Sequence, residues 1–104
     1  MPESGDVVIA RVQFVDTEES KIRPALVLFE ELGNIVIAGI TTNLQMKGIP
    51  IYKKDGAAQD SIIKLNYIFT ITGNAVIKTV FQLSPEKKHL VFDEFIKNLN
   101  SLKV

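Results

Sequence analysis

Arg23 is the residue whose type and surroundings point most directly to chemistry in this sequence. The chain contains two arginines, Arg11 and Arg23, against ten lysines, so lysine is its ordinary surface cation. Arg23 stands directly before Pro24 at the head of the segment KIRPALVL, where a buried strand is expected to begin. A guanidinium presents a planar fork of donors that fits a phosphate or a carboxylate. Arg23 is therefore a candidate oxyanion-binding residue, and the ordinary alternative is an ion pair in the preceding turn with Asp16, Glu18 or Glu19.

A run of short polar side chains, Thr41-Thr42-Asn43, follows the apolar segment IVIAGI. Their hydroxyl and amide groups can donate hydrogen bonds to an oxyanion. Threonines are also common at strand ends, so on this run alone the structural interpretation is the more ordinary one.

The remaining ionisable residues do not form a recognisable metal site or catalytic relay. His89 is the single histidine and lies in the first half of a predicted helix, where solvent exposure or a dimer edge is the ordinary expectation. The carboxylates Glu18-Glu19 and Glu30-Glu31 are adjacent pairs in predicted turns. No glycine-rich phosphate loop or nucleophile-elbow motif occurs. We therefore expect no metal and no cofactor.

Composition and length favour one globular domain covering residues 1–104. An apolar fraction of 46% and a charged fraction of 23% are ordinary for a folded protein. The absence of cysteine excludes a disulfide framework, a thiolate metal site and a cysteine nucleophile. No apolar run approaches the roughly 20 residues that cross a bilayer, and the acidic start MPESGD lacks the features of a secretory signal. We expect a cytoplasmic protein without a membrane partner.

Charge is balanced overall but unevenly distributed. Twelve basic and twelve acidic residues cancel, so no global field draws the protein to a polyanion. Residues 1–31 hold seven acids and three bases, whereas residues 32–80 hold two acids and five bases. A nucleic acid would therefore meet the middle of the chain more readily than its beginning.

Apolar residues in alternation, separated by turn signals, predict six or seven short strands. The polar residues 53–60 are expected to form a mobile loop, and Pro24 is compatible only with the first residue of a strand or with an edge strand. Ser84 and Pro85 suit an N-cap and a first helical position, and the apolar spacing after them predicts one amphipathic C-terminal helix. The fold class is thus mostly β, a small barrel with the helix covering one side or one opening. The expected strands cover residues 6–15, 25–29, 35–41, 49–52, 61–65, 68–72 and 75–82, with a bend near Asn66.

Several strings of this sequence, taken in order, resemble the MazF/PemK family of toxin endoribonucleases. They are GDVVIARVQFVD, ESKIRPALVL, IVIAGITTN, QDSIIKLNYIFTI and the helix opening LSPE, and they cover the chain from Gly5 to about Leu102. The most specific parts are GDVV, RPALVL, the threonine after IAGI, and DSII. The resemblance implies an SH3-like barrel that forms a homodimer, with RNA in a groove across the dimer interface.

The resemblance also implies a mechanism. Family members are similar in cleaving single-stranded RNA without a metal, with the 2′-hydroxyl as the internal nucleophile. The family's arginine before proline matches Arg23, and the threonine that ends its third strand matches Thr41. The implied roles are contact of Arg23 with the scissile phosphate, with a part in proton transfer, and a hydrogen bond from Thr41 to a nonbridging oxygen.

The sequence departs from the family pattern at three places. Some members carry an arginine and an aspartate where Lys64 and Asn66 stand, others carry an arginine at the position of Phe69, and the loop TEESK is shorter than its counterpart. Neither Lys64 nor Asn66 can act as a carboxylate base, and lysine lacks the guanidinium fork. RNA preference is therefore open, and weakened or absent cleavage is an alternative outcome.

A wider set of polar residues is predicted to contact RNA around the two matched positions. Scattered lysines are more often simple solvating charges, so this set ranks below Arg23 and Thr41. The predicted RNA-binding residues are Lys21, Thr42, Asn43, Gln45, Lys53, Lys54, Lys64 and Asn66, with Lys47 and Tyr52 as further candidates.

Three functions are open from the sequence. The first is the toxin of a type II toxin–antitoxin system, an endoribonuclease held inactive by a cognate antitoxin whose peptide covers the groove. The second is a noncatalytic protein of the same fold that binds a protein target such as DNA gyrase through its terminal helix. The third is a structural or regulatory barrel without toxicity. Retention of both Arg23 and Thr41 favours the first, since a pure binder would not require the pair.

Overall fold

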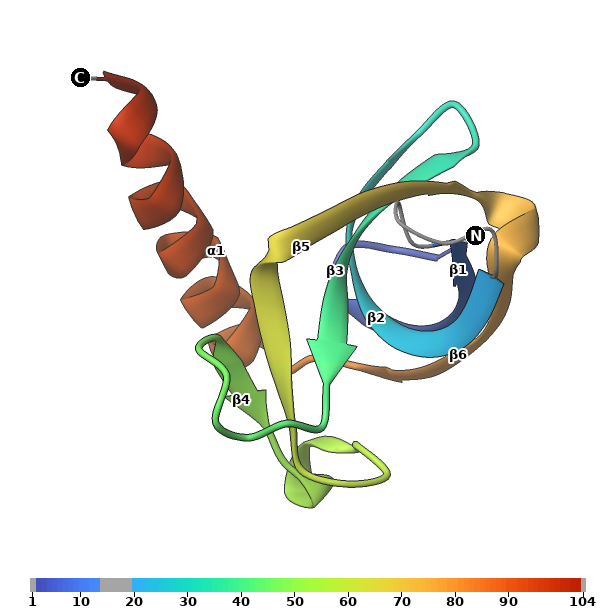
Figure 1. The fold of residues 1–104 in the computed structure, drawn as a ribbon, viewed down its shortest axis with the longest axis horizontal. Coiled ribbons are helices and arrows are strands. Elements are labelled where there is room, and N and C mark those ends of the chain that lie inside the picture. The colour runs from blue at the N-terminus through green and yellow to red at the C-terminus, as the bar shows by residue number, and fades with distance from the viewer. Residues whose placement is uncertain (1, 14–19, 104) are drawn as a thin grey trace.

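The computed structural model describes residues 2–13 and 20–103. Within these residues the chain forms six strands, one α-helix and three short 3₁₀ turns (Figure 1). The strands are β1 (Asp6–Gln13), β2 (Ser20–Glu31), β3 (Asn34–Thr41), β4 (Ile49–Ile51), β5 (Ser61–Thr72) and β6 (Val76–Gln82). The helix is α1 (Pro85–Leu99), and the 3₁₀ turns are η1 (Lys53–Asp55), η2 (Gly73–Ala75) and η3 (Asn100–Lys103).

The six strands form one antiparallel sheet in the order β4-β5-β3-β2-β1-β6. Figure 1 shows the long strands bending around a common interior, with α1 standing outside it. Register shifts lie within the pairings β1–β6, β2–β3 and β3–β5, and such irregularities increase local bend and twist. The result is a curled half-barrel with one C-terminal helix, so the predicted fold class is confirmed.

Two clusters of buried side chains form the core, one on each face of the sheet. Successive residues of a strand point to opposite faces, so Val7 and Val8 of β1 enter different clusters. The cluster that includes a residue of α1 consists of Val7, Leu26, Ala38, Ile40, Ile49, Ile51, Ile63, Leu65, Leu83 and Val91. The other consists of Val8, Ala10, Val12, Ala25, Val27, Ile35 and Ile37. Residues from both faces of β1, β2 and β3 enter these clusters, which fixes the register of the three strands where they are buried.

β5 is a single long strand with a sharp change of register where two strands were expected. Ala38 of β3 pairs with Ile68 of β5, whereas the next residue, Gly39, pairs with Lys64. Residues 65–67 of β5 therefore have no counterpart in β3. The predicted bend is at the right place, but the strand continues through it.

Pro24 lies inside β2 rather than at its first residue, because β2 begins at Ser20. It pairs with Ile9 of β1, whereas the pairing of β2 with β3 starts only at Ala25, opposite Gly39. A proline has no N–H to give to either ladder. At Pro24, β2 is paired with β1 but not with β3. The strand is therefore an edge strand at this residue, which agrees with the expectation that a proline lies on an edge.

α1 begins as the sequence predicts. Ser84 is the N-cap, and its Oγ accepts a hydrogen bond from the backbone amide of Lys87 at 3.2 Å. Pro85 occupies the first helical position. No helix in the described part of the chain is long and apolar enough to span a bilayer.

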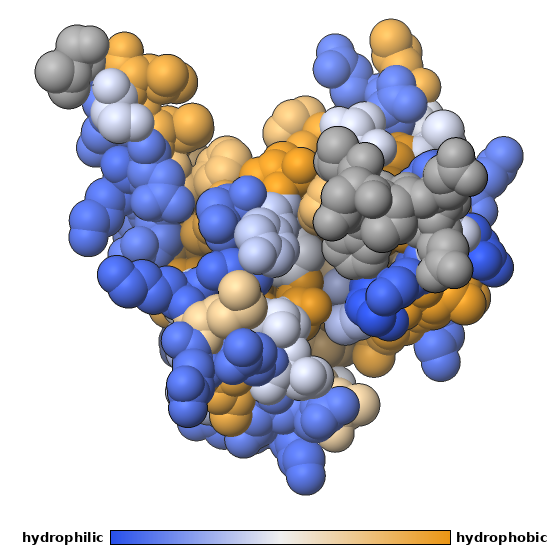
Figure 2. Space-filling view, viewed as in Figure 1, coloured by the Kyte–Doolittle hydropathy of each residue, from blue (hydrophilic) through white to orange (hydrophobic). Residues whose placement is uncertain are grey.

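Much of the apolar side of α1 is left uncovered by this chain. Val91 is the buried residue of the helix, whereas Phe92, Ile96 and Leu99 are 61%, 43% and 42% exposed. Figure 2 shows apolar surface along the side of α1 that borders the hollow between helix and sheet. Part of this hollow is a cavity of about 330 Å³ between α1 and β2.

Gly48 lies beside β4, where the chain passes close to β5, and a side chain there has no room. A Cβ at this position would lie 2.2 Å from the Ile63 carbonyl oxygen and 2.5 Å from the Ile62 side chain. Gly48→Ala is therefore expected to lower the free energy of unfolding by about 1–3 kcal/mol, as overpacking does. Gly73→Ala is the matched control, since its Cβ would approach only the Gly33 carbonyl oxygen, at 3.8 Å. Urea unfolding of both variants checks this, and equal midpoints would contradict the close approach.

Candidate active site

The structure brings Arg23 and Thr41 together at the point where β2 and β3 separate. Ala25 is paired with Gly39, and Arg23 and Thr41 each lie two residues beyond that pair, toward the same end of the sheet. Side chains two residues apart in a strand share a face. Both residues accordingly line the same two cavities, one of about 590 Å³ and one of about 170 Å³.

The larger of these, here called the Arg23 cavity, is apolar over much of its wall with a few polar groups. Among the described residues, Arg23 is the one charged group that lines it. Its other polar side chains belong to Thr41, Thr42, Gln59 and Ser61. The apolar lining comes from Val7, Ile9, Ile22, Pro24, Ile40, Ile51, Ala57, Ala58, Val80 and Phe81. A lone cation among apolar walls favours an anionic ligand, because no lining carboxylate in the described part of the chain competes for it.

The guanidinium of Arg23 is exposed and only lightly tied down. Its Nη1 donates a hydrogen bond to the carbonyl oxygen of Ile22 at 3.0 Å. Within the ranges 2–13 and 20–103 no other hydrogen bond and no ion pair of this side chain is present. The alternative of an ion pair with Asp16, Glu18 or Glu19 falls on residues outside the described ranges, so it stays untested. The remaining donors of the fork suit a bidentate oxyanion ligand.

The hydroxyl of Thr41 is oriented by the chain that follows it. Thr41 Oγ1 accepts a hydrogen bond from the Asn43 amide at 3.1 Å, and Asn43 Oδ1 accepts one from the Gln45 amide at 3.1 Å. The Met46 amide donates to the Asn43 carbonyl oxygen at 3.2 Å. An oxygen that accepts from the backbone keeps its own hydrogen to donate elsewhere. The arrangement therefore presents Thr41 as a hydrogen-bond donor at the mouth of the Arg23 cavity.

Part of the wall of the Arg23 cavity is formed by the chain between β4 and β5, residues 53–60, here called the β4–β5 turn. It begins with η1, where the Gly56 amide donates to the Lys53 carbonyl oxygen at 3.0 Å. The Lys53 amide donates to Asp60 Oδ1 at 3.1 Å, which closes the turn at its other end. These hydrogen bonds lie at both ends of the segment that was expected to form a mobile loop. The β4–β5 turn has a definite conformation that brings Gln59 to the cavity.

Lys64 and Asn66 lie apart from the Arg23 cavity. Lys64 is 7% exposed, and its Nζ donates to the Lys47 carbonyl oxygen at 3.0 Å and stands 5.2 Å from the centre of the Tyr67 ring. Both residues, with Lys47, line a separate open hollow beside α1. Tyr67, whose ring lies beside the Lys64 ammonium, also lines the 170 Å³ cavity together with Arg23. The ammonium of Lys64 is thus occupied by the protein itself.

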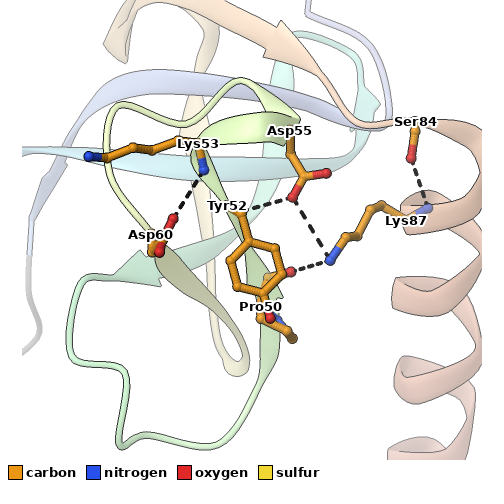
Figure 3. Close-up of polar contacts among 7 residues, drawn as sticks. All are labelled: Pro50, Tyr52, Lys53, Asp55, Asp60, Ser84 and Lys87. Carbon is orange, nitrogen blue, oxygen red and sulfur yellow. Dashed lines mark hydrogen bonds and ion pairs between the residues drawn. The ribbon is translucent and has the colours of Figure 1, made fainter.

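The other predicted RNA-binding residues are spread over the exposed surface. Thr42 lines the Arg23 cavity, whereas Lys21 lies two residues before Arg23 on the same face of β2. Lys54 has its ammonium 5.6 Å from the centre of the Tyr52 ring. Figure 3 shows the Lys53 side chain extending away from Asp60. The exposed members of the predicted set are Lys21, Thr42, Asn43, Gln45, Lys53, Lys54 and Asn66.

Three polar residues near the site were missed from the sequence. Ser61 is 5% exposed, its Oγ donates to the Gln59 carbonyl oxygen at 2.9 Å, and both residues line the Arg23 cavity. Tyr67 joins Arg23 and Thr41 at the smaller cavity. The signal for Ser61 was present in the string DSII, whereas no sequence pattern marks Gln59 or Tyr67.

No group of three or more histidine, cysteine, aspartate or glutamate side chains that could hold a metal occurs in the part of the chain that the structure describes. His89 is exposed to solvent, which was one of the two expectations for it. Its Nε2 lies 3.4 Å from Asp93 Oδ2, one helical turn away. Neither residue lines the Arg23 cavity.

Comparison with known sequences assigns the family. A profile described as "PemK-like, MazF-like toxin of type II toxin-antitoxin system" matches residues 3–99. The chain belongs to this family. The resemblance seen in the sequence motifs is thereby confirmed. A curated relative, endoribonuclease EndoA of Bacillus subtilis (strain 168), is 30% identical over an alignment of 93 residues that covers 79% of this chain and 80% of EndoA.

Solved structures agree on the fold. The toxin MazF-mt6 of Mycobacterium tuberculosis superposes with a TM-score of 0.77 at 20% identity, covering 91% of this chain and 96% of that one. An endoribonuclease from a mycobacterial species, solved in complex with its cognate antitoxin, gives a TM-score of 0.73 at 12% identity, with 95% and 93% coverage. At such identities the likeness concerns the fold. The residue roles of a PemK/MazF-like toxin must be argued from this chain's own site.

Arg23 contributes little to the core, which allows its function to be separated from stability. Because its side chain is exposed, Arg23→Gln is expected to change the free energy of unfolding by less than about 0.5 kcal/mol. Leu26→Ala, three residues along the same strand and 1% exposed, should cost about 2–5 kcal/mol. Denaturant unfolding of both variants tests the contrast. A large destabilisation by Arg23→Gln would mean that this residue is structural.

Proposed function

We propose that this protein is the toxin of a type II toxin–antitoxin system and that it cleaves single-stranded RNA without a metal. The observation that carries the proposal is the placement of Arg23 and Thr41 at one cavity, at the separating ends of two paired strands. Family membership and the 30% identity to endoribonuclease EndoA support it.

In the proposed reaction the 2′-hydroxyl of the RNA attacks the adjacent phosphorus. A bond forms from the 2′-oxygen to phosphorus and the bond to the 5′-oxygen breaks, while the 2′-hydroxyl loses a proton and the 5′-oxygen gains one. The products are a 2′,3′-cyclic phosphate and a 5′-hydroxyl. No oxidant, reductant or external nucleophile is consumed.

Arg23 and Thr41 act on the charge that develops at phosphorus. The guanidinium contacts two phosphate oxygens, and the Thr41 hydroxyl donates to a nonbridging oxygen. No histidine or carboxylate lines the Arg23 cavity within the described residues. Electrostatic stabilisation by preorganised donors is therefore the main contribution of the site.

RNA binding beyond the scissile phosphate falls to further polar residues, most of them exposed. The proposed contacts are Lys21, Thr42, Asn43, Gln45, Lys53, Lys54, Lys64 and Asn66. Lys64 differs from the others, because its ammonium already donates to Lys47. It contributes positive charge near the Tyr67 ring rather than a free hydrogen-bonding fork.

The partners in this proposal are single-stranded RNA, a cognate antitoxin and a second copy of the chain, and the setting is the cytoplasm. The mycobacterial relative solved with its antitoxin supports the second of these. A single copy presents one Arg23 cavity, and the family resemblance implies a groove for RNA that two copies share.

A noncatalytic protein binder is the second candidate function. It is favoured by the exposed apolar side chains of α1, Phe92, Ile96 and Leu99. Such a protein would use the helix and would tolerate loss of Arg23.

Cleavage is tested by incubating the purified protein with mixed RNA in EDTA and mapping the product ends. Discrete cuts with cyclic phosphate ends are expected. Arg23→Gln and Thr41→Val should each lower the rate by about 10²–10³-fold, because each removes one group that stabilises the transition state. Arg11→Gln is the control, since Arg11 is exposed on β1 and lines neither cavity. Intact RNA would favour the binder, and a fully active Arg23→Gln would remove the assigned role.

The homodimer is tested by sedimentation velocity at micromolar concentration. We expect a dimer for the wild-type protein and for Arg23→Gln, because Arg23 is proposed to contact RNA. A monomer under these conditions would contradict the shared groove while leaving cleavage itself to the RNA assay.

A further inference from the structure

Lys87 connects the first turn of α1 to the chain around β4. Its Nζ donates a hydrogen bond to the Pro50 carbonyl oxygen at 2.5 Å, lies 4.0 Å from Asp55 Oδ2 and stands 5.1 Å from the centre of the Tyr52 ring. Figure 3 shows the side chain leaving the helix and ending between Pro50 and Asp55. Its backbone is fixed at the other end, because the Lys87 amide donates to the N-cap Ser84.

Asp55 links this lysine to the backbone of the β4–β5 turn. Its Oδ2 accepts a hydrogen bond from the Tyr52 amide at 2.8 Å, and its own amide donates to the Tyr52 carbonyl oxygen at 2.8 Å. The side chains of Lys87 and Asp55 are 18% and 16% exposed, so solvent and salt screen their contacts less than those of a surface pair. The start of the helix, β4 and the beginning of the turn are therefore bonded into one unit.

The same turn forms a wall of the Arg23 cavity. Ala57, Ala58 and Gln59 line it, and Gly56 rests on Phe81, another lining residue. A Cβ at position 56 would lie 2.7 Å from the Phe81 ring, which shows how closely the turn is seated. Lys87 itself does not line the cavity. A shift of the turn would change the shape of the Arg23 cavity.

We propose that Lys87 is a positioning residue for the RNA cleavage assigned above, acting through Asp55 and the β4–β5 turn. The inference rests on that proposed function. Lys87 holds this part of the cavity wall in the position that the bound RNA requires. Small errors in the placement of reacting groups are costly, since a misplacement of about 1 Å can reduce a rate by about 10²-fold.

The test compares three variants of the full-length protein in steady-state cleavage of an RNA oligonucleotide. Lys87→Met keeps the apolar stem and removes the ammonium, Lys87→Arg keeps the charge and the donors, and Lys97→Met removes an exposed lysine of the same helix. We expect kcat of Lys87→Met to fall about tenfold with a smaller change in KM. Lys87→Arg should recover most of the rate, and Lys97→Met should match the wild type.

Hydrogen exchange separates positioning from simple loss of the fold. The Tyr52, Asp55 and Gly56 amides are hydrogen-bonded within the turn, so Lys87→Met should speed their exchange while amides of the core strands β1 and β3 stay protected. Wild-type kcat for Lys87→Met would overturn the proposal, whether or not exchange at the turn is faster. So would a loss of rate accompanied by faster exchange throughout the core. If the wild-type protein leaves RNA intact, the proposed function is wrong, and this inference is wrong with it. If the wild-type protein and Lys87→Met cleave RNA at the same rate, only this inference is wrong.

Discussion

The parting of β2 and β3 just beyond the Ala25–Gly39 pair is the constraint on which the candidate site depends. Next to that pair, residues of both strands are buried on both faces, and the core fixes their register. Beyond it Pro24 supplies no N–H, and the strand ends separate. Arg23 and Thr41 are therefore held by a rigid ladder on one side and open to a cavity on the other. A slip of one residue by either strand would turn that strand's side chains to the opposite face and separate Arg23 from Thr41, so the core controls the site directly.

The sequence was sufficient for features that are set locally. Alternating apolar residues located the strands of the sheet, and Ser84 with Pro85 located the start of α1, because these patterns depend on side-chain direction and capping over a few residues. Arg23 was found for a similar reason, since its rarity and its place before Pro24 are visible without a structure. The extent of β2 could not be predicted from the sequence, because its first residues form a strand only through their pairing with β1. The bend in β5 was located, but its continuity depends on β3 holding both of its halves.

Features that depend on contacts between distant segments were beyond the sequence. The ammonium of Lys64 donates to the carbonyl oxygen of Lys47, and only the register of β5 brings the two residues near each other. Gln59 reaches the cavity because the turn is seated on Phe81. The sequence contains a partial indication of the hydrogen bonds in that turn, since aspartates such as Asp55 and Asp60 often accept hydrogen bonds from nearby backbone amides. Composition alone suggested only a polar loop.

The exposure of Arg23 has a consequence for how such a protein can change over generations. Its side chain lies outside both core clusters, so the energy that folds the chain and the charge proposed to act on phosphate reside in different residues. On the proposed function, a single substitution there would yield a descendant that folds but no longer cleaves RNA. One inherited change would then remove the activity and leave the fold and most of the surface as they were.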